Sequence, residues 1–366
     1  MPHGRDGAAV VALTPNDGEP MHALIAALPH WRRLPFAAAL VAFVLALPCV
    51  APAVAAPAPP SADGLQRELD RLIAPFDGKV GAYVLDLRSG RSAQVNGGSG
   101  FPMASTVKVP VAVHILALVD EGRLDLRQQV LLQAADIYPA MGGPMDIHLS
   151  AGSAITVRDL LHMMLTVSDN NATDILIRLG GGPAAVDARM RALGIGGIRV
   201  DRYIWEMLAH YMGELEVSAD RPISHEAYAV LDATVRSVEE QRRFTRLYNQ
   251  DPRDTSTPAG MAELLRRIWE GRALRPDTTA VLKAILLDCR TGQGRLKGML
   301  PEATPVAHKT GTVDEVINDV GVITLPGGRG EMVVAVYLVS GAGDQARDRM
   351  IAQVARAAHD YFVFVP

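Results

Sequence analysis

Strand-like segments near both ends of the chain, with helical segments between them, constrain the fold more than any other feature. The runs 79–87 and 92–95 are rich in apolar and β-branched residues and are separated by a short turn, which predicts a hairpin. The runs 316–325 and 331–339 have the same character and are separated by a Pro-Gly-Gly turn. Strands at both ends imply one sheet that both terminal parts complete.

The segments between and around these strands repeat their apolar residues with a helical period. The expected helical segments are 63–74, 105–121, 156–180, 260–287 and 344–361. The expected fold class is therefore α+β, an antiparallel sheet built from both terminal parts and flanked by helices as an α/β sandwich, with an all-α domain inserted. The sheet part would take in about 63–120 and 300–362, and the helical part about 121–299.

The first 55 residues have the pattern of a secretory signal peptide. A basic stretch at 30–33 precedes an apolar stretch at 34–48 and the small residues Ala53-Val54-Ala55, which predicts cleavage after Ala55 and a periplasmic or secreted protein without stable membrane insertion. An uncleaved anchor is the alternative, because apolar length alone does not decide cleavage. The expected organisation is a signal peptide at 1–55, with 1–20 as an upstream extension, a linker at 56–62 and one domain at 63–362.

The composition excludes several classes of function. The 36 basic and 40 acidic residues give a formal charge of −4, so the chain lacks the positive field that attracts nucleic acid. Cys289 is the only cysteine after the signal peptide, so no intrachain disulfide is expected, and its apolar helical surroundings predict a buried structural thiol. No spacing of His or Cys predicts a metal site. We expect a monomer without a cofactor.

Ser105 and Lys108 form the first motif that carries chemistry. Residues three apart lie on one face of a helix, so at a helix start the lysine amine can reach the serine hydroxyl and help to remove its proton. Of the 36 basic residues only five are lysines, and only Lys108 has a serine three positions before it. A lysine can lose its proton where an arginine cannot, so this pair predicts an activated nucleophile.

Ser168, Asp169 and Asn170 form the second motif, after an apolar helical run. A hydroxyl beside an amide can relay a proton and hold the amide group of a substrate. Asp169 is expected to be a structural hydrogen-bond acceptor. Taken alone, the same residue types also predict an ordinary helix cap, so the motif has two interpretations at this point.

Lys309-Thr310-Gly311-Thr312 is the third motif and is expected at the end of a strand. An ammonium group, hydroxyl groups and a glycine that permits close backbone approach suit a substrate carboxylate lying along a strand edge. The alternative interpretation is a polar transition from a strand to a turn.

In this order the three motifs resemble the signature of the penicillin-recognising serine hydrolases, Ser-x-x-Lys, Ser-Asp-Asn and Lys-Thr-Gly. The segments 136–139, 254–262 and 290–300 are similar to the cleft lip, the end of the Ω-loop and the C-terminal order of class A β-lactamases. The resemblance covers about 63–362. It implies the β-lactamase/transpeptidase-like fold and a serine hydrolase that opens β-lactams through an acyl-enzyme.

The resemblance also implies a role for each motif residue. Ser105 would be the acylated nucleophile, Lys108 its activating base, and Ser168 the group that passes the proton to the leaving nitrogen. Backbone N–H groups of Ser105 and Thr312 would form the oxyanion hole. The substrate-binding residues would be Tyr138 as a wall of the cleft, Asn170 for a side-chain amide, and Lys309, Thr310, Gly311 and Thr312 for the carboxylate.

The resemblance is interrupted at the Ω-loop, where class A enzymes carry the glutamate that hydrolyses the acyl-enzyme. Arg202 and Asp254 are similar to the residues that tie this loop, but they lie 52 positions apart around a largely helical insertion at 203–253. Ile204 stands where the base is expected. Glu206 is the nearest carboxylate and our candidate, and the alternative is that Glu206 is a helix-face residue and the base is missing.

These two alternatives separate the possible functions. With a base, the chain would be a β-lactamase, and without one it would be a D-alanyl-D-alanine peptidase acting on cell-wall peptide, an esterase or a slow penicillin-binding hydrolase. A binding module without turnover is a third class, but a complete catalytic set is more than binding requires. Met332 stands where many relatives carry an arginine for the carboxylate, so Lys309 would bear more of that task.

Overall fold

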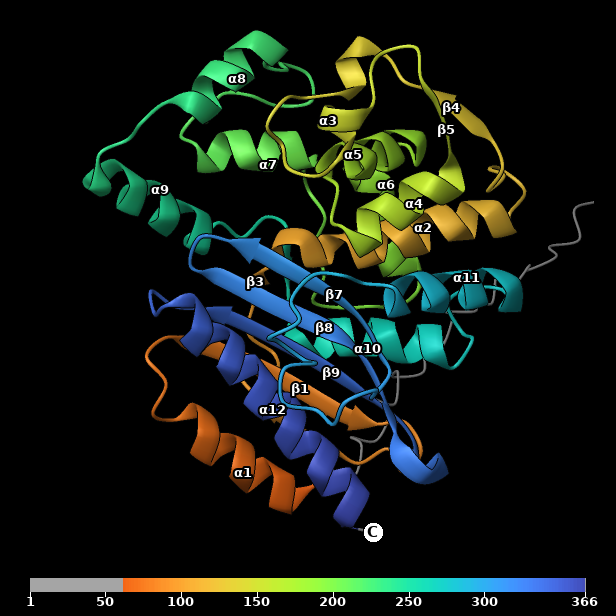
Figure 1. The fold of residues 1–366 in the computed structure, drawn as a ribbon, viewed down its shortest axis with the longest axis vertical. Helices are drawn as coiled ribbons and strands as arrows, with labels where there is room; N and C mark the ends of the chain where they lie inside the picture. Colours follow the sequence, from red (N-terminus) through yellow and green to blue (C-terminus); the bar gives the residue numbers. More distant parts are fainter. Residues whose placement is uncertain (1–61, 366) are drawn as a thin grey trace, which may run out of the picture. The chain divides into compact units, whose positions relative to one another are not determined.

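A five-stranded antiparallel sheet forms the centre of residues 62–365, the part of the chain that this computed structural model describes (Figure 1). Its strands lie in the order β2-β1-β9-β8-β7. They are β1 (Lys79–Asp86), β2 (Ser92–Val95), β7 (Val306–Val313), β8 (Val316–Leu325) and β9 (Gly330–Val339). Because β1 pairs with β9, both terminal parts complete one sheet, and the predicted α+β fold class is confirmed.

Helices cover both faces of this sheet. α1 (Asp63–Ile73) and α12 (Asp344–Phe364) pack on one face, and α10 (Pro258–Trp269) packs on the other (Figure 1). Successive residues of a strand point to opposite faces, so the neighbours Val336 and Tyr337 of β9 enter different hydrophobic clusters. This alternation buries the sheet on both sides.

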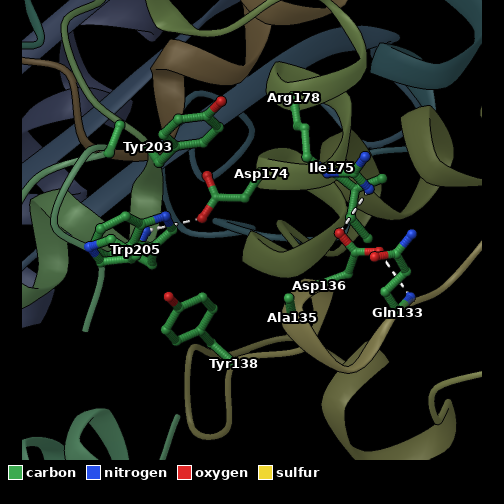
Figure 2. A pocket seen from close by; sticks show the side chains of 11 residues that line it. Gln133, Ala135, Asp136, Tyr138, Asp174, Ile175, Arg178, Tyr203 and Trp205 are labelled. Carbon is green, nitrogen blue, oxygen red and sulfur yellow. Dashed lines mark hydrogen bonds and ion pairs between the residues drawn. The ribbon is translucent and has the colours of Figure 1, made fainter. Parts of the chain in front are cut away.

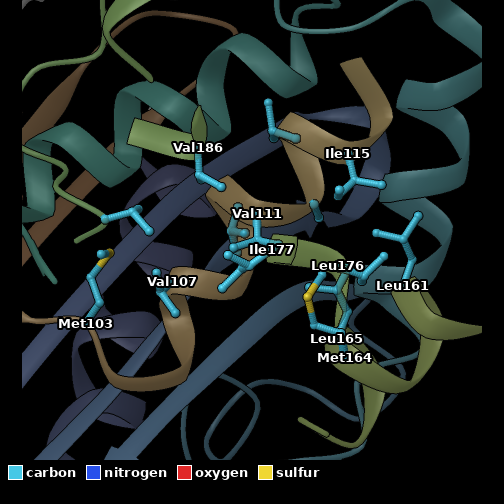
Figure 3. Close-up of a cluster of buried hydrophobic side chains, with 14 of the residues drawn as sticks. Met103, Val107, Val111, Ile115, Leu161, Met164, Leu165, Leu176, Ile177 and Val186 are labelled. Carbon is cyan, nitrogen blue, oxygen red and sulfur yellow. The ribbon is translucent and has the colours of Figure 1, made fainter. Parts of the chain in front are cut away.

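The remaining helices and short ladders form the part inserted between the terminal strands. They are α2 (Lys108–Asp120), α3 (Met145–His148), α4 (Val157–Thr166), α5 (Asn170–Leu179), α6 (Pro183–Ala192), α7 (Ile204–Tyr211), α8 (His225–Ala233), α9 (Val238–Gln250) and α11 (Pro276–Leu287), with β3 (Phe101–Pro102) paired to β6 (Thr255–Ser256) and β4 (Gln129–Leu131) paired to β5 (Ala154–Thr156). α2 is apolar on all sides and is buried from Lys108 to Leu118, among side chains of α4, α5 and α6 (Figure 3).

The helical period at 156–180 belongs to two helices, α4 and α5, and not to one. Ser168 separates them with a φ of 62°, a left-handed conformation that is unfavourable for a residue with a side chain. Asp169 then caps α5, because its carboxylate accepts a hydrogen bond from the N–H of Ala172 at 2.8 Å. The break leaves Ser168 outside both helices.

The insertion at 203–253 folds into α7, α8 and α9, so its predicted helical character is confirmed. Tyr228 of α8 is 1% exposed and lies edge-on to Tyr138, with ring centroids 5.3 Å apart. Ser237 and Glu240 start α9 with a capping box. These contacts dock the insertion on the helical part.

The predicted signal peptide and nearly all of the predicted linker lie outside the described residues. Among residues 62–365, no helix combines the length and apolar character that crossing a membrane requires.

Tyr228→Ala tests the docking of the insertion. Loss of the buried ring leaves a cavity against Tyr138, so we expect the free energy of unfolding to fall by about 3 kcal/mol in urea denaturation followed by circular dichroism. Val230→Ala, on the same helix but 69% exposed, is the control and should change it by less than about 0.5 kcal/mol. Equal, small effects of both substitutions would show that α8 is not docked in solution.

Candidate active site

Ser105 lies in a 3₁₀ turn, Ala104–Val107, that leads directly into α2. The sequence predicted it on the helix itself. Ala104 before it has a φ of 45°, so the turn adopts a left-handed backbone at a residue that disfavours it. The Ser105 side chain is partly exposed and makes no hydrogen bond to any residue of 62–365. Its hydroxyl is therefore free to meet a substrate.

Lys108 is fully buried at the start of α2. Its Nζ donates to the backbone oxygen of Ser168 at 2.7 Å, to Ser168 Oγ at 3.0 Å and to Asn170 Oδ1 at 2.6 Å. Burial lowers the pKa of Lys108 well below its ordinary value, the charge of Lys309 lowers it further, and Asp169 and Asp174 oppose this. The three hydrogen bonds use every N–H of the ammonium form and orient the group, whereas burial opposes this form and favours the neutral, basic amine.

Ser168 Oγ joins the two lysines of the site. It accepts from Lys108 Nζ and from Lys309 Nζ, each at 3.0 Å. A hydroxyl that accepts two hydrogen bonds still has its own proton to donate. The structure therefore brings the first, second and third motifs together at one oxygen atom, although they lie far apart in the sequence.

The other two residues of the second motif are held by the fold. The Asp169 carboxylate accepts from the N–H groups of Met145 and Ala172, each at 2.8 Å, so its predicted structural role is confirmed. Asn170 Oδ1 accepts from Lys108, and Asn170 Nδ2 donates to the carbonyl oxygen of Met141. A substrate amide would therefore compete with Met141 for the Asn170 side chain.

The third motif lies within β7, and not at its end as the sequence predicted. Lys309 is fully buried, and its Nζ also donates to the carbonyl oxygen of Thr310 at 2.9 Å. Burial lowers the pKa of Lys309 to about 8, which leaves the ammonium form dominant at neutral pH. Thr310 Oγ1 lies 2.6 Å from Thr291 Oγ1, which fixes its orientation.

Gly311 allows β7 to pass directly against the turn that carries Ser105. A Cβ at this position would lie 2.6 Å from the carbonyl oxygen of Met103 and 3.2 Å from the backbone nitrogen of Ser105. The first distance is too short for any side chain, so glycine is required by packing. The same approach brings the following residue, Thr312, to the edge of the site.

Arg295 also lies beside the third motif. In the sequence it is one of many arginines, and no pattern there marks it as a site residue. Its guanidinium donates to Thr312 Oγ1 at 2.8 Å, to the carbonyl oxygen of Gly311 at 3.1 Å and to Asp348 Oδ1 at 2.8 Å. It is a positive charge beside β7, and it is ion-paired with Asp348. Met332 itself is fully buried on the face of the sheet that α1 and α12 cover.

Cys289 is a free thiol and is 3% exposed, so its predicted burial is confirmed. Burial raises the pKa of this thiol, but the interaction with His308 outweighs burial and brings the pKa to about 7. His308 Nδ1 lies 2.9 Å from Asp319 Oδ1, and its Nε2 makes no hydrogen bond within the described residues. The sequence offered no histidine near Cys289, because His308 reaches it only through the fold.

Tyr138 is largely covered by the insertion and lines a cavity beside it. Its ring is 8% exposed and stacks on Trp205 with centroids 5.6 Å apart and an interplanar angle of 6°. Its hydroxyl donates to the carbonyl oxygen of Ile223 at 3.1 Å. The insertion therefore covers the residue that the sequence placed as a wall of the substrate site.

Arg202 and Asp254 form the tie that the sequence predicted. Arg202 Nε donates to Asp254 Oδ2 at 2.6 Å, and both side chains are buried. Glu206 is 8% exposed, and burial raises its pKa, opposed by Arg202 and reinforced by Asp254. Glu206 thus lies close to the charges of Arg202 and Asp254. It is not among the charged groups that mainly shift the pKa of Lys108.

Asp174 is the carboxylate of the helical part that does act on Lys108, and the sequence analysis did not single it out. Its Oδ1 accepts from the N–H of Ile204 at 2.6 Å and its Oδ2 from the N–H of Trp205 at 3.0 Å. Asp174 therefore caps the start of α7 at Ile204, the position where the sequence analysis expected the base. Burial raises the pKa of Asp174 to about 7.

The sequence and the fold of this chain are similar to those of known proteins. A model of the β-lactamase enzyme family matches residues 64–362. β-Lactamase L2 of Stenotrophomonas maltophilia is 32% identical over 90% of this chain and 98% of its own, and the extended-spectrum β-lactamase PER-1 of Pseudomonas aeruginosa is 28% identical over 81% and 87%. The solved structure of the TLA-3 extended-spectrum β-lactamase covers 82% of this chain and 99% of its own, with 26% identity and a TM-score of 0.68. An ancestral class A β-lactamase structure covers 81% and 99%, with 33% identity and a TM-score of 0.65. This chain belongs to the β-lactamase enzyme family and has the fold of its class A members.

Proposed function

We propose that this protein is a serine hydrolase that opens β-lactam rings through an acyl-enzyme at Ser105. The observation that carries the proposal is the shared hydrogen bonding of Ser168 Oγ to two buried lysines, Lys108 and Lys309, beside an unpaired serine hydroxyl. A binding site needs no such pair of buried amines. The relatives with matching sequence are named β-lactamases, which gives the substrate class.

Acylation follows from the positions of three side chains. The Ser105 hydroxyl oxygen attacks the lactam carbonyl carbon while neutral Lys108 takes the hydroxyl proton. As the C–N bond breaks, Ser168 donates its proton to the leaving nitrogen and is reprotonated through the ammonium group of Lys108. Backbone N–H groups of Ser105 and Thr312 stabilise the oxyanion, because Gly311 lets the two backbone segments approach.

The substrate carboxylate binds along β7. Lys309 supplies an ammonium group and Arg295 a guanidinium group, and Thr310 and Thr312 supply hydroxyl donors. Both cations are nearly excluded from water, but Arg295 is ion-paired with Asp348, so Lys309 supplies most of the attraction for the carboxylate.

Deacylation requires a base that removes a proton from water, and Glu206 remains our candidate. Burial raises its pKa, which makes it a better base than an exposed glutamate once it is ionised. Its location beside the Arg202–Asp254 tie favours a second function, a slow penicillin-binding hydrolase or D-alanyl-D-alanine peptidase, in which the acyl-enzyme is long-lived.

Export through the N-terminal signal at 1–55 and a monomeric state are part of the proposal.

The acyl-enzyme is the first thing to measure. With benzylpenicillin, intact-protein mass spectrometry of the wild type should detect a covalent adduct, transient or stable, while drug consumption is followed in the same tube. Ser105→Ala removes the only proposed nucleophile and should give no adduct. An adduct on Ser105→Ala would rule out the assignment, whereas rapid consumption by the wild type would exclude the slow hydrolase.

Glu206→Gln separates the two functions. If Glu206 is the base, the deacylation rate should fall about 100-fold while acylation is nearly unchanged, so the adduct accumulates in stopped reactions. Glu239→Gln, an exposed position in the same insertion, is the control and should alter neither rate. Unchanged deacylation in Glu206→Gln would remove this residue from the mechanism.

The pH dependence of binding tests Lys309. The ammonium form attracts the substrate carboxylate and is lost as the pH rises through its pKa of about 8. The Michaelis constant for benzylpenicillin should therefore rise toward about tenfold per pH unit above that value. Lys309→Arg keeps its charge in this range and should abolish the rise, even if its rate is lower. A Michaelis constant that stays flat for the wild type up to pH 10, about two units above this pKa, contradicts the assignment.

A further inference from the structure

A cavity of about 330 Å³ lies beside the group of Ser105, Lys108, Ser168 and Lys309 and is lined by none of these four residues (Figure 2). α5, the start of α7, the segment 133–138 and the insertion form its walls. The lining residues used in the argument are Tyr138, Asp174, Arg178, Tyr203, Trp205 and Ala219. The insertion contributes Trp205 and Ala219, so this chain's long Ω-loop builds part of the cavity.

Asp174 is the one lining carboxylate whose charge has no ionic partner. The other one, Asp136, accepts from Arg178 at 2.7 Å and is neutralised by it. Asp174 accepts only from the backbone N–H groups of Ile204 and Trp205, and no cationic side chain of residues 62–365 lies within ion-pair distance. When Asp174 is ionised, the cavity therefore carries one uncompensated negative charge.

Lys108 does not supply the missing positive charge. Its three N–H groups donate to Ser168 and Asn170. Asn170 lies one turn before Asp174 on α5. A buried carboxylate gains most from a partner that brings a full positive charge into the same low-dielectric space. Carboxylate oxygens that each accept one N–H also retain lone pairs for a further donor.

Aromatic rings form the wall next to this carboxylate. Tyr203 and Trp205 lie 6.5 Å apart at 17°, and Trp205 and Tyr138 lie 5.6 Å apart at 6°, so three rings form one stack. Figure 2 shows Asp174 between Tyr203 and Trp205 on one side of the cavity, with Ile175 and Arg178 on the other. Aromatic faces attract cations and the apolar bodies that carry them.

We propose that this cavity binds a small organic cation, with a protonated or quaternary amine against Asp174 and an apolar body against Tyr138, Tyr203 and Trp205. An anion would meet uncompensated negative charge and aromatic faces, and a neutral ligand would leave Asp174 unpaired. The proposal goes beyond β-lactam hydrolysis and does not depend on the chemistry of Ser105.

The cation site is connected to the active site through α5. Asp174 lies four positions after Asn170 on the same helix, and its negative charge raises the pKa of Lys108. A cation bound to Asp174 offsets that charge and favours neutral Lys108. Occupation of the cavity should thus act on the base of the acylation step without contact with the substrate.

The test compares benzylamine, which is protonated at neutral pH, with neutral benzyl alcohol by isothermal titration calorimetry on the mature chain. We expect the amine to bind at least about tenfold more tightly. Asp174→Asn should abolish this difference. Asp220→Asn removes the same charge from an exposed position next to the lining segment but outside the cavity, and should leave the difference intact.

Ala219→Trp is a second variant that distinguishes loss of binding from a folding defect in Asp174→Asn. It keeps the carboxylate and fills the cavity from an exposed position. It should block benzylamine while hydrolysis of benzylpenicillin continues. Equal affinity for the amine and the alcohol, or unchanged amine binding in both Asp174→Asn and Ala219→Trp, would overturn the proposal.

The pH dependence gives a further readout with the fixed charge of benzyltrimethylammonium. Only ionised Asp174 attracts it, so its affinity should rise through the Asp174 pKa of about 7 and level off above it. Lys108 and Glu206 also act on Asp174, and the raised pKa of Tyr203 keeps that phenol neutral. Loss of the pH dependence in Asp174→Asn assigns it to this carboxyl group, and its persistence would contradict the proposal.

Discussion

Two buried lysines that share one serine oxygen are the interaction on which the site depends. Lys108 and Lys309 are both excluded from water, and their ammonium groups converge on Ser168 Oγ. Burial of two like charges is unfavourable, so each lysine loses part of its affinity for a proton. Three separate units of the fold, α2, the break between α4 and α5, and β7, each place a side chain at this oxygen. The chemistry follows from that convergence.

Close backbone approach is the second constraint, and it explains the unusual conformations around Ser105. Ala104 and Ser168 both adopt left-handed backbone angles, and Gly311 leaves no space for a Cβ. Such strain persists only where surrounding packing fixes it, and buried α2 provides that support. The positions of Ser105 and Ser168 are thus determined by packing on the hydrophobic core.

The sequence predicted those parts of the molecule whose signals are local. The sheet strands, the helices and the three motifs could be found because periodicity and short spacing are properties of contiguous residues. Arg295 could not be found, since only the fold brings its guanidinium to Thr312. The burial of Tyr138 depends on α8, more than eighty positions later, and the role of Asp174 depends on the start of α7. The sequence of a segment does not show that a distant insertion packs over it.

The insertion also separates the control of acylation from that of deacylation. Acylation depends on side chains held by α2, α5 and β7, whereas the ionisation of Glu206 depends on burial and on the Arg202–Asp254 tie. Asp174 links the two, because it caps α7 and acts on Lys108 and Glu206 alike. Any change at the start of α7 therefore alters both the amine that removes the serine proton and the carboxylate proposed to activate water. In the proposed mechanism, the long Ω-loop thus connects these two steps through one half-buried carboxyl group.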